Sequence, residues 1–169
     1  MLLFGHMGIG YKLSQLIKTK IKPSLKGILI GSLLPDIIDK PLYFILVCVT
    51  GRQGEELGFI NGTRTFAHTG LFFMILFILT FYKRNIFFIC IVIGQFTHLL
   101  LDCLSTYILW PDKFINFFIV FFWPLLGIRF PPTELKNFHD AEMYYLNPFL
   151  IGFEVIGIVC LMPLLFKRK

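Results

Sequence analysis

Residues 86–110 read IFFICIVIGQFTHLLLDCLSTYILW, an apolar run whose only charged or imidazole side chains are those of His98 and Asp102. About 20 apolar residues are enough for a helix to cross a bilayer, so this segment predicts a transmembrane helix. His98 and Asp102 stand four residues apart and therefore project from one face of that helix. A charged side chain at the bilayer centre costs roughly 2.5–3.5 kcal/mol, so the pair indicates a functional site. An imidazole and a carboxylate at this spacing can also hold a metal ion at two points.

The composition of the whole chain is that of a membrane protein. Its 169 residues are 56% hydrophobic and only 15% charged, with a mean hydropathy of +0.76. Soluble domains carry about 25% charged residues, so we predict one integral membrane domain over residues 1–169. The net charge of +6 lies beside the apolar segments, which favours a role in membrane orientation over nucleic-acid binding. The four cysteines fall in apolar stretches without CxxC spacing, so we expect neither disulfides nor a thiolate zinc site.

The fold class expected is all-α, a polytopic membrane helix bundle with about five transmembrane helices. Four segments are long and apolar enough to span, namely 25–49, 66–82, 86–110 and 147–166. Residues 2–18 are less apolar and either form a fifth span, which we expect, or lie as an amphipathic helix at the interface. The apolar run 114–126 is short and contains Pro124, which favours an outer re-entrant or interfacial element.

Charge predicts the orientation of this bundle. One set of helix ends carries only basic residues: Lys18, Lys20, Lys22, Lys26, Lys83, Arg84, Lys167, Arg168 and Lys169. The opposite ends carry most of the acidic residues. The positive-inside rule places the basic ends in the cytoplasm. With five spans the N-terminus is then outside and the C-terminus is cytoplasmic.

Polar residues on four of these segments reach a similar depth in the membrane. His98 lies twelve residues past Ile86, which is about 18 Å at 1.5 Å per residue. Asp36, His68 and His6 lie at comparable distances from the cytoplasmic ends of their own segments. Independent placement would not give this agreement. We therefore expect one shared site, nearer the outer face.

Asp36 and Asp39 lie in a segment that we expect to be broken. Pro35 and Pro41 stand six residues apart, with Gly31 upstream. A proline inside a helix removes a hydrogen bond and clashes with the preceding turn. Irregular backbone at membrane depth lines a cavity or is buried in protein, so both aspartates are candidates for the site. The alternative is that either one merely caps the half-helix that follows.

Three further residues have open roles at this stage. Arg64 lies one turn before His68, near a helix N-terminus, where it could hold a phosphate or carboxylate or, alternatively, snorkel to the interface. Glu154 falls near the same depth and could be a ligand, a general base or the partner of a cation. His139 and Asp140 are expected to belong to a solvated outer loop.

Several short motifs follow one another in a recognisable order. They are Gly5-His6, Leu34-Pro35-Asp36 with Asp39-Lys40-Pro41, Arg64 with Ala67-His68-Thr69, His98-Leu-Leu-Leu-Asp102, and Trp123-Pro124-Leu125. This ordered set resembles the YdjM-like family of membrane-bound proteins, which are predicted metal-dependent hydrolases. The resemblance covers most of the chain up to about residue 130. It implies a metal hydrolase in the inner (plasma) membrane of a prokaryote.

The resemblance also implies which residues form the metal site. They are His6, Asp36, His68, His98 and Asp102. The family is thought to be distantly similar to zinc-dependent phospholipase C enzymes, in which His and Asp hold a metal cluster for phosphoester hydrolysis. The chain departs from the bacterial form Leu-Pro-Asp-Ile-Asp-His, because it has an extra Ile before Asp39 and Lys40 in place of the His. This departure leaves the role of Asp39 and of position 40 open.

These residues suggest a mechanism. Three histidines with two or three aspartates suit a divalent ion, with zinc first and manganese or iron after it, as one ion or two. Such a site activates a bound water and clamps the oxygens of a phosphoester. We expect hydrolysis of a lipid or lipid-linked phosphoester or ester, reached from the outer leaflet. Asp39 or Glu154 would be the general base and Arg64 the phosphate contact. The aromatic residues 121–123 would hold acyl or prenyl chains, or anchor the protein at the interface.

Two alternatives belong to other functional classes. The first is a non-enzymatic metal-binding membrane protein or an ion or solute transporter that uses the same carboxylates, although five spans without a repeat are unusual for a transporter. The second is a structural protein whose buried polar cluster ties helices together. The cost of several carboxylates in the membrane argues against the second, because apolar packing would serve as well.

Overall fold

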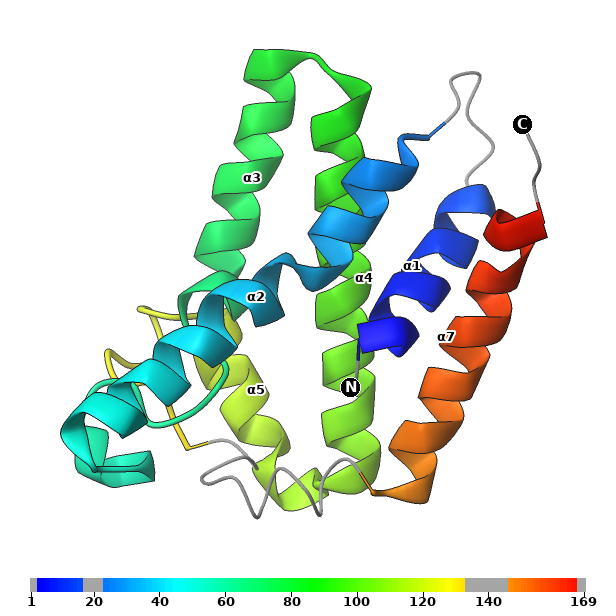
Figure 1. Cartoon of the computed structure of the whole chain (residues 1–169). Coiled ribbons are helices and arrows are strands. Elements are labelled where there is room, and N and C mark those ends of the chain that lie inside the picture. Colours follow the sequence, from blue (N-terminus) through cyan, green and yellow to red (C-terminus); the bar gives the residue numbers. More distant parts are fainter. Residues whose placement is uncertain (1–2, 17–22, 133–145, 167–169) are drawn as a thin grey trace.

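The computed structural model describes residues 3–16, 23–132 and 146–166, and within these it is all-helical apart from one isolated bridge between Ile60 and Phe130. The all-α prediction is therefore confirmed (Figure 1). The helices are α1 (Leu3–Leu16), α2 (Leu25–Thr50), α3 (Gly70–Lys83), α4 (Ile86–Leu109), α5 (Phe114–Phe121) and α7 (Pro148–Phe166). Three short 3-10 turns accompany them: η1 (Gly54–Leu57), η2 (Phe66–His68) and η3 (Pro111–Lys113).

Helix α4 is the one helix of the described segments that is both long and apolar enough to cross a membrane by itself. Residues Gly70–Lys83 and Pro148–Leu164 are apolar but shorter. Helix α2 has 26 residues but carries Lys26, Asp36, Asp39 and Lys40. Length and composition therefore support one span, and the count of about five spans stays a prediction.

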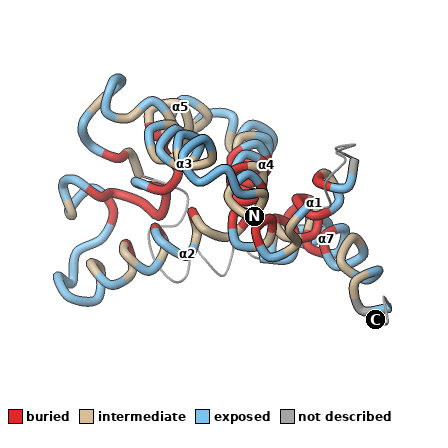
Figure 2. The backbone as a smooth tube through the Cα atoms, turned by 90° about the horizontal axis from the view of Figure 1, so that it is seen from above, coloured by how far each residue is buried: buried red, intermediate tan, exposed pale blue. Residues whose placement is uncertain are grey.

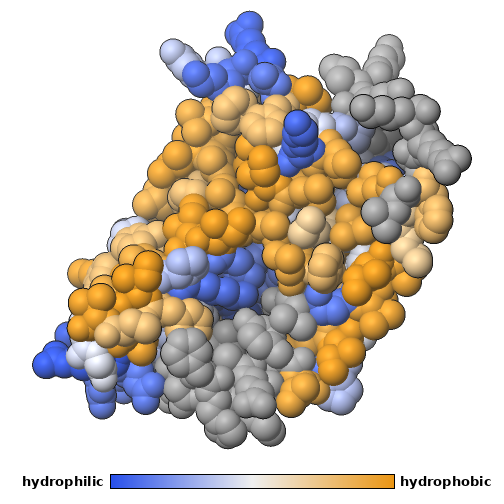
Figure 3. Space-filling view, in the orientation of Figure 1, coloured by the Kyte–Doolittle hydropathy of each residue, from blue (hydrophilic) through white to orange (hydrophobic). Residues whose placement is uncertain are grey.

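The surface is apolar in the way expected of a protein that lies in lipid. On α3, for example, Leu71, Met74, Ile75 and Ile78 are all exposed. Figure 3 shows hydrophobic residues over most of the visible face. Soluble monomers rarely expose continuous apolar patches of more than a few hundred Å². The buried residues instead gather on α4, on α1 and on the stretch that leads into α3 (Figure 2).

Glycines allow α2 and α4 to pack closely. A Cβ added at Gly31 would overlap the backbone of Ile91, and one added at Gly94 would lie 2.7 Å from the backbone nitrogen of Ser32. Small residues let two helix backbones approach in this way, which is a common device between membrane helices. The close approach brings the middle of α2 against the part of α4 that carries His98.

The expected break in residues 25–49 is a bend instead. Helix α2 runs without interruption from Leu25 to Thr50 through both Pro35 and Pro41, and Figure 1 shows that its direction changes midway. Its ends are those of an ordinary helix, with Ser24 as N-cap and Gly51 in the left-handed conformation (φ 66°) as C-cap. No half-helix begins at the aspartates, so neither of them caps one.

The apolar run 114–126 folds back after α4 instead of crossing alongside it. Its helical part, α5, has only eight residues and is followed by turns up to Leu126. Beyond it, Phe130 donates its backbone N–H to the carbonyl of Phe59 (3.0 Å). The Phe130 ring also contacts the rings of Phe66 and Trp123. These contacts tie the loop before η2 to the loop after α5. The re-entrant or interfacial placement of this run relative to the membrane stays a prediction.

Candidate metal centre

Four elements bring six polar side chains into one buried cluster. They are His6 from α1, Asp36 and Asp39 from α2, His68 from η2, and His98 and Asp102 from α4. Five of them are at most 2% exposed, and only Asp36 is partly accessible, with its side chain 16% exposed. The structure thus brings together all five residues that were expected to bind metal. Whether they do so remains a proposal.

The hydrogen bonds of His98 and His68 determine which ring nitrogens are protonated. His98 Nδ1 lies 2.7 Å from the carbonyl oxygen of Ser32, which can only accept. His68 Nδ1 lies 2.7 Å from a carboxylate oxygen of Asp39. Each Nδ1 therefore donates, and in the neutral rings each Nε2 carries a lone pair.

These two Nε2 atoms lie 3.3 Å apart. Two lone pairs that face each other repel, so the pair needs a positive charge nearby: a proton shared by the rings or a metal ion. Asp36 Oδ1 lies 3.7 Å from Nε2 of His68 and 3.9 Å from that of His98. Asp102 Oδ2 lies 3.5 and 3.7 Å from the same two atoms. Each of these two carboxylate oxygens thus lies within 3.9 Å of both ring nitrogens.

The spacing of these atoms favours a metal ion over a shared proton. Ligands about 2.0–2.1 Å from a tetrahedral zinc ion are separated from one another by about 3.3 Å. The observed separations of 3.3 to 3.9 Å are close to this value, and most exceed a hydrogen bond. A shared proton would satisfy the histidine pair, but the distances of 3.5 to 3.9 Å from the carboxylate oxygens to these nitrogens are longer than the hydrogen bonds that a protonated pair would form with them.

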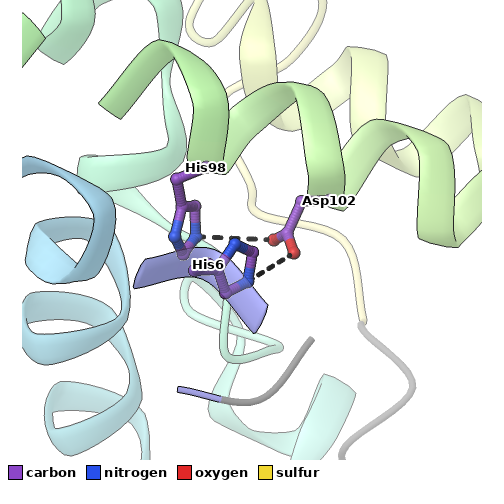
Figure 4. A group of neighbouring side chains, drawn as sticks. All are labelled: His6, His98 and Asp102. Carbon is purple, nitrogen blue, oxygen red and sulfur yellow. Dashed lines mark ion pairs between the residues drawn. The ribbon is translucent and has the colours of Figure 1, made fainter. Parts of the chain in front are cut away.

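His6 supplies an independent observation. Its side chain is completely buried, and neither ring nitrogen has a hydrogen-bond partner among the described residues. Its Nε2 lies 3.4 Å from Asp102 Oδ1, and its ring stacks on His98 with 3.9 Å between centroids (Figure 4). A buried polar group without a partner costs about 1–3 kcal/mol. Binding a metal ion through Nε2 would remove this cost for one of the two nitrogens.

The donors form two overlapping groups, His6–His98–Asp102 and Asp36–His68–His98, with the ligand atoms of each group within 4.8 Å of one another. His98 belongs to both groups. Its Nδ1 is engaged by Ser32, so it offers only the Nε2 lone pair, which binds one ion. His98 can therefore bind an ion shared with either group but not one in each, and the number of ions, one or two, stays as the sequence left it.

Asp39 lies behind His68, on the side of the ring away from the other donors. Its carboxylate accepts the backbone N–H groups of Thr65 (2.8 Å) and Ala67 (3.1 Å) as well as His68 Nδ1–H. A carboxylate that binds the second nitrogen of a metal-binding histidine fixes the tautomer and orientation of the ring. The geometry therefore favours a positioning role for Asp39 over the general-base role expected from the sequence.

Two cations lie against the aspartates of the cluster. Arg64 Nε lies 3.0 Å from Asp102 Oδ2, and Arg64 Nη1 donates to Thr106 Oγ1 (2.9 Å). Lys40 Nζ lies 2.6 Å from Asp36 Oδ2. The sequence analysis missed the Lys40 pairing, although the spacing of four residues on a helix signals it. The contact through the Ser32 carbonyl leaves no signal in the sequence, because any residue has that group.

Glu154 lies on α7 and contacts the start of α1, outside the two donor groups. Its two carboxylate oxygens accept the backbone N–H groups of Phe4 (2.9 Å) and Gly5 (2.8 Å). The first N–H groups of a helix have no partner inside the helix, and a carboxylate stabilises them. Glu154 of α7 therefore holds the turn that carries His6. The other loop residues of interest, His139 and Asp140, lie outside the described residues.

The cluster has one partly exposed member, Asp36. Figure 3 shows a hydrophilic hollow beside α2 within an otherwise hydrophobic face. Asp36, the partly exposed member of the cluster, and its partner Lys40 have side chains 16% and 25% exposed. A carboxylate and an ammonium group are therefore partly accessible next to the buried histidines.

Comparison with known proteins assigns the family. The chain belongs to the YdjM inner membrane protein family, whose model matches residues 1–164. Neither a search of curated proteins nor a search of solved structures gave a match. The family expected from the motifs is thus confirmed, and its description places the chain among inner membrane proteins without assigning a reaction.

Proposed function

We propose that this member of the YdjM family is a membrane-embedded, metal-dependent hydrolase that cleaves a phosphoester or ester of a lipid or lipid-linked substrate. The observation that carries the proposal is the convergence of two histidine Nε2 atoms, 3.3 Å apart, with oxygens of Asp36 and Asp102. Strongly polar groups inside a membrane protein are rare and mark functional sites.

The donor set suits zinc, with manganese or iron as alternatives. Imidazole nitrogen and carboxylate oxygen are common ligands of zinc, and catalytic zinc sites keep one position open for water or substrate. When bound, such an ion lowers the pKa of a coordinated water toward 7 and so supplies a nucleophile at neutral pH.

The charges of the surrounding residues favour one divalent ion and an anionic substrate. The cluster holds three carboxylates, from Asp36, Asp39 and Asp102, and two cations, Lys40 and Arg64. With neutral histidines this leaves one negative charge, and a divalent ion makes it one positive charge. A phosphoester would neutralise that charge. Two divalent ions would leave three uncompensated positive charges in a buried site, which is costly.

The chain's own residues would then have distinct roles. His6, His68, His98, Asp36 and Asp102 would hold the ion. Asp39 would orient His68, and Glu154 would hold the turn that carries His6. Arg64 would hold Asp102 in place and contact the phosphate from the cavity that it lines with Lys113 and Asn116.

We further propose that α1, α2, α3 and α7 cross the membrane with α4. Lys83 and Arg84 lie at the turn between α3 and α4. Glu55 and Glu56 lie in η1, which follows the C-terminal end of α2 at the opposite end of the bundle (Figure 1). By the positive-inside rule the α3–α4 turn is cytoplasmic. The metal centre is then nearer the outer face and the C-terminus is cytoplasmic.

Metal analysis combined with turnover tests the proposal. The detergent-purified protein should contain about one equivalent of zinc by elemental mass spectrometry, and His98→Ala and Asp36→Ala should lose most of it. Asp112→Asn is the matched control, because Asp112 is an exposed carboxylate on η3 outside the cluster. The protein should also hydrolyse some member of a panel of lipid phosphoesters and esters, and a chelator should abolish this activity.

One observation favours a second candidate, a metal-binding membrane protein without turnover. Four of the five proposed ligands are at most 2% exposed, as in closed structural sites. Stoichiometric metal without hydrolysis over a broad lipid panel would support this candidate, and metal flux into proteoliposomes would support transport. A protein that binds no metal under any supplementation would reject both the hydrolase and these alternatives.

A further inference from the structure

Two adjoining apolar cavities hollow the surface between α3, α4 and α5. The larger has a volume of about 460 Å³ and is lined by Leu71, Phe73, Met74, Phe121 and Trp123, among others. The smaller, of about 200 Å³, lies between Phe96, Leu100 and Phe117. The two cavities share the lining residues Phe73 and Phe121 and are therefore neighbours; together we name them the α3–α5 groove. Its size is that of ligand sites, which run from roughly 300 to 1,000 Å³.

A cationic cavity adjoins this groove. The smaller cavity shares Phe117 with a third cavity, which is lined by Arg64, Lys113 and Asn116. This third cavity has a volume of only about 10 Å³, so it does not enclose a phosphate. A phosphate group would lie at its mouth, where guanidinium and ammonium groups both favour it. An apolar groove thus lies beside a basic cavity, an arrangement that complements an anionic amphiphile.

Arg64 links the groove to the metal centre. The same guanidinium that lines the third cavity contacts Asp102, with Nε 3.0 Å from Oδ2. A head group that reaches Arg64 from the groove is therefore one side chain away from the proposed ligands.

We propose that the α3–α5 groove binds one acyl chain of an anionic phospholipid whose phosphate lies against Lys113 and Arg64. The assignment of that lipid as the substrate rests on the proposed function. The groove lies at the Gly70 end of α3, opposite Lys83, so the lipid belongs to the outer leaflet in the orientation given above.

Trp123 makes the proposal measurable. It lines the groove, and the chain has only one other tryptophan, Trp110. In a Trp110→Phe background, Trp123 is the sole indole fluorophore. The protein is reconstituted in phosphatidylcholine vesicles that contain a small fraction of phospholipid brominated in one acyl chain, since bromine quenches a tryptophan on contact. We expect brominated phosphatidylglycerol to quench Trp123 at least two-fold more than brominated phosphatidylcholine at the same fraction.

Two pairs of variants place the lipid. Met74→Gln should lower the quenching by brominated phosphatidylglycerol toward that by phosphatidylcholine, whereas Ile78→Gln should not. Both residues are about half exposed on α3 (49% and 59%), but only Met74 lines the groove. Lys113→Gln should remove the preference for the anionic lipid, and Lys83→Gln, at the other end of α3, should leave it.

Each outcome decides the proposal. Equal quenching by the two lipids overturns it, because bulk lipid alone then surrounds Trp123. A preference that survives both Met74→Gln and Lys113→Gln also overturns it. The measurement needs neither metal nor turnover and is repeated with a chelator, so the two proposals fail separately. A preserved lipid preference in a protein that binds no metal rejects the metal centre but leaves the groove.

Discussion

Replacing Asp39 by asparagine tests how the metal centre is positioned. Oδ2 of Asp39 accepts His68 Nδ1–H (2.7 Å) and the N–H of Thr65 (2.8 Å), and Oδ1 accepts the N–H of Ala67 (3.1 Å). Asparagine has the same shape and one oxygen. If that oxygen takes the place of Oδ2, it keeps the bond to the His68 ring, and its NH₂ group then faces the N–H of Ala67.

The expected effect is a moderate loss of metal affinity. The bond to the His68 ring survives without its negative charge, so the imidazole becomes a weaker ligand but stays in place. Loss of such an outer partner typically costs 10–100-fold in affinity, or about 1.4–2.8 kcal/mol. The N–H of Ala67 keeps its 3.2 Å contact with the remaining oxygen but now also faces the NH₂ group, which adds a cost in folding of about 1 kcal/mol, with or without metal.

The assay is zinc affinity by competition with a chromophoric chelator in detergent at fixed pH. Thermal unfolding of the metal-free variant gives the folding cost separately. Cobalt at saturation should give the same visible spectrum as in the wild-type protein, because no ligand is removed. His68→Ala is the comparison and should abolish binding. The reasoning is refuted if the zinc affinity of Asp39→Asn is within two-fold of that of the wild-type protein. It is also refuted if Asp39→Asn, like His68→Ala, binds no zinc.

Three further changes have defined outcomes. Gly94→Ala should destabilise the protein by about 1–3 kcal/mol in thermal unfolding, since the added Cβ would overlap the backbone of α2. Gly152→Ala is the control and should be neutral or slightly stabilising, because no atom lies within 4 Å of the added Cβ. Glu154→Gln should lower the free energy of unfolding by about 1–2 kcal/mol and weaken zinc binding less than ten-fold, because one of the two oxygens that accept the first N–H groups of α1 is lost. Glu55→Gln, at an exposed residue, is the control, and no change in either measurement would contradict this role of Glu154. Zinc at 100 times its dissociation constant should raise the stability of the wild-type protein by about 2.7 kcal/mol, and a chelator should remove the gain; an equal gain in His98→Ala would place the metal elsewhere.

The sequence predicted the helical class and the depth at which the polar residues meet, because both follow from local spacing. Apolar runs set the helices, and a rise of 1.5 Å per residue carries His6, Asp36, His68 and His98 to one level. The bend of α2 was predicted as a break. A proline removes one hydrogen bond, but packing against α4 keeps the remaining turns helical, and packing cannot be read from one segment.

The roles of the outer residues were less predictable for the same physical reason. Asp39 or Glu154 was expected to be the general base because both are carboxylates near the right depth. In the structure the Asp39 oxygens accept backbone N–H groups from the segment before α3. The Glu154 oxygens accept backbone N–H groups from the start of α1. A backbone N–H is present in every residue except proline, so the sequence gives no sign of which carboxylate will find one.

The close packing of α2 on α4 leads directly to the chemistry of the site. Gly31 and Gly94 let the two backbones touch, and this approach brings the Ser32 carbonyl to 2.7 Å from His98 Nδ1. That carbonyl can only accept, so Nδ1 keeps its proton and the Nε2 lone pair points into the cluster. A larger residue at either glycine would separate the helices and release the tautomer, even though neither glycine contacts a proposed ligand's ring nitrogen. The glycines and the histidine therefore form one device, in which helix packing sets the protonation state that metal binding requires.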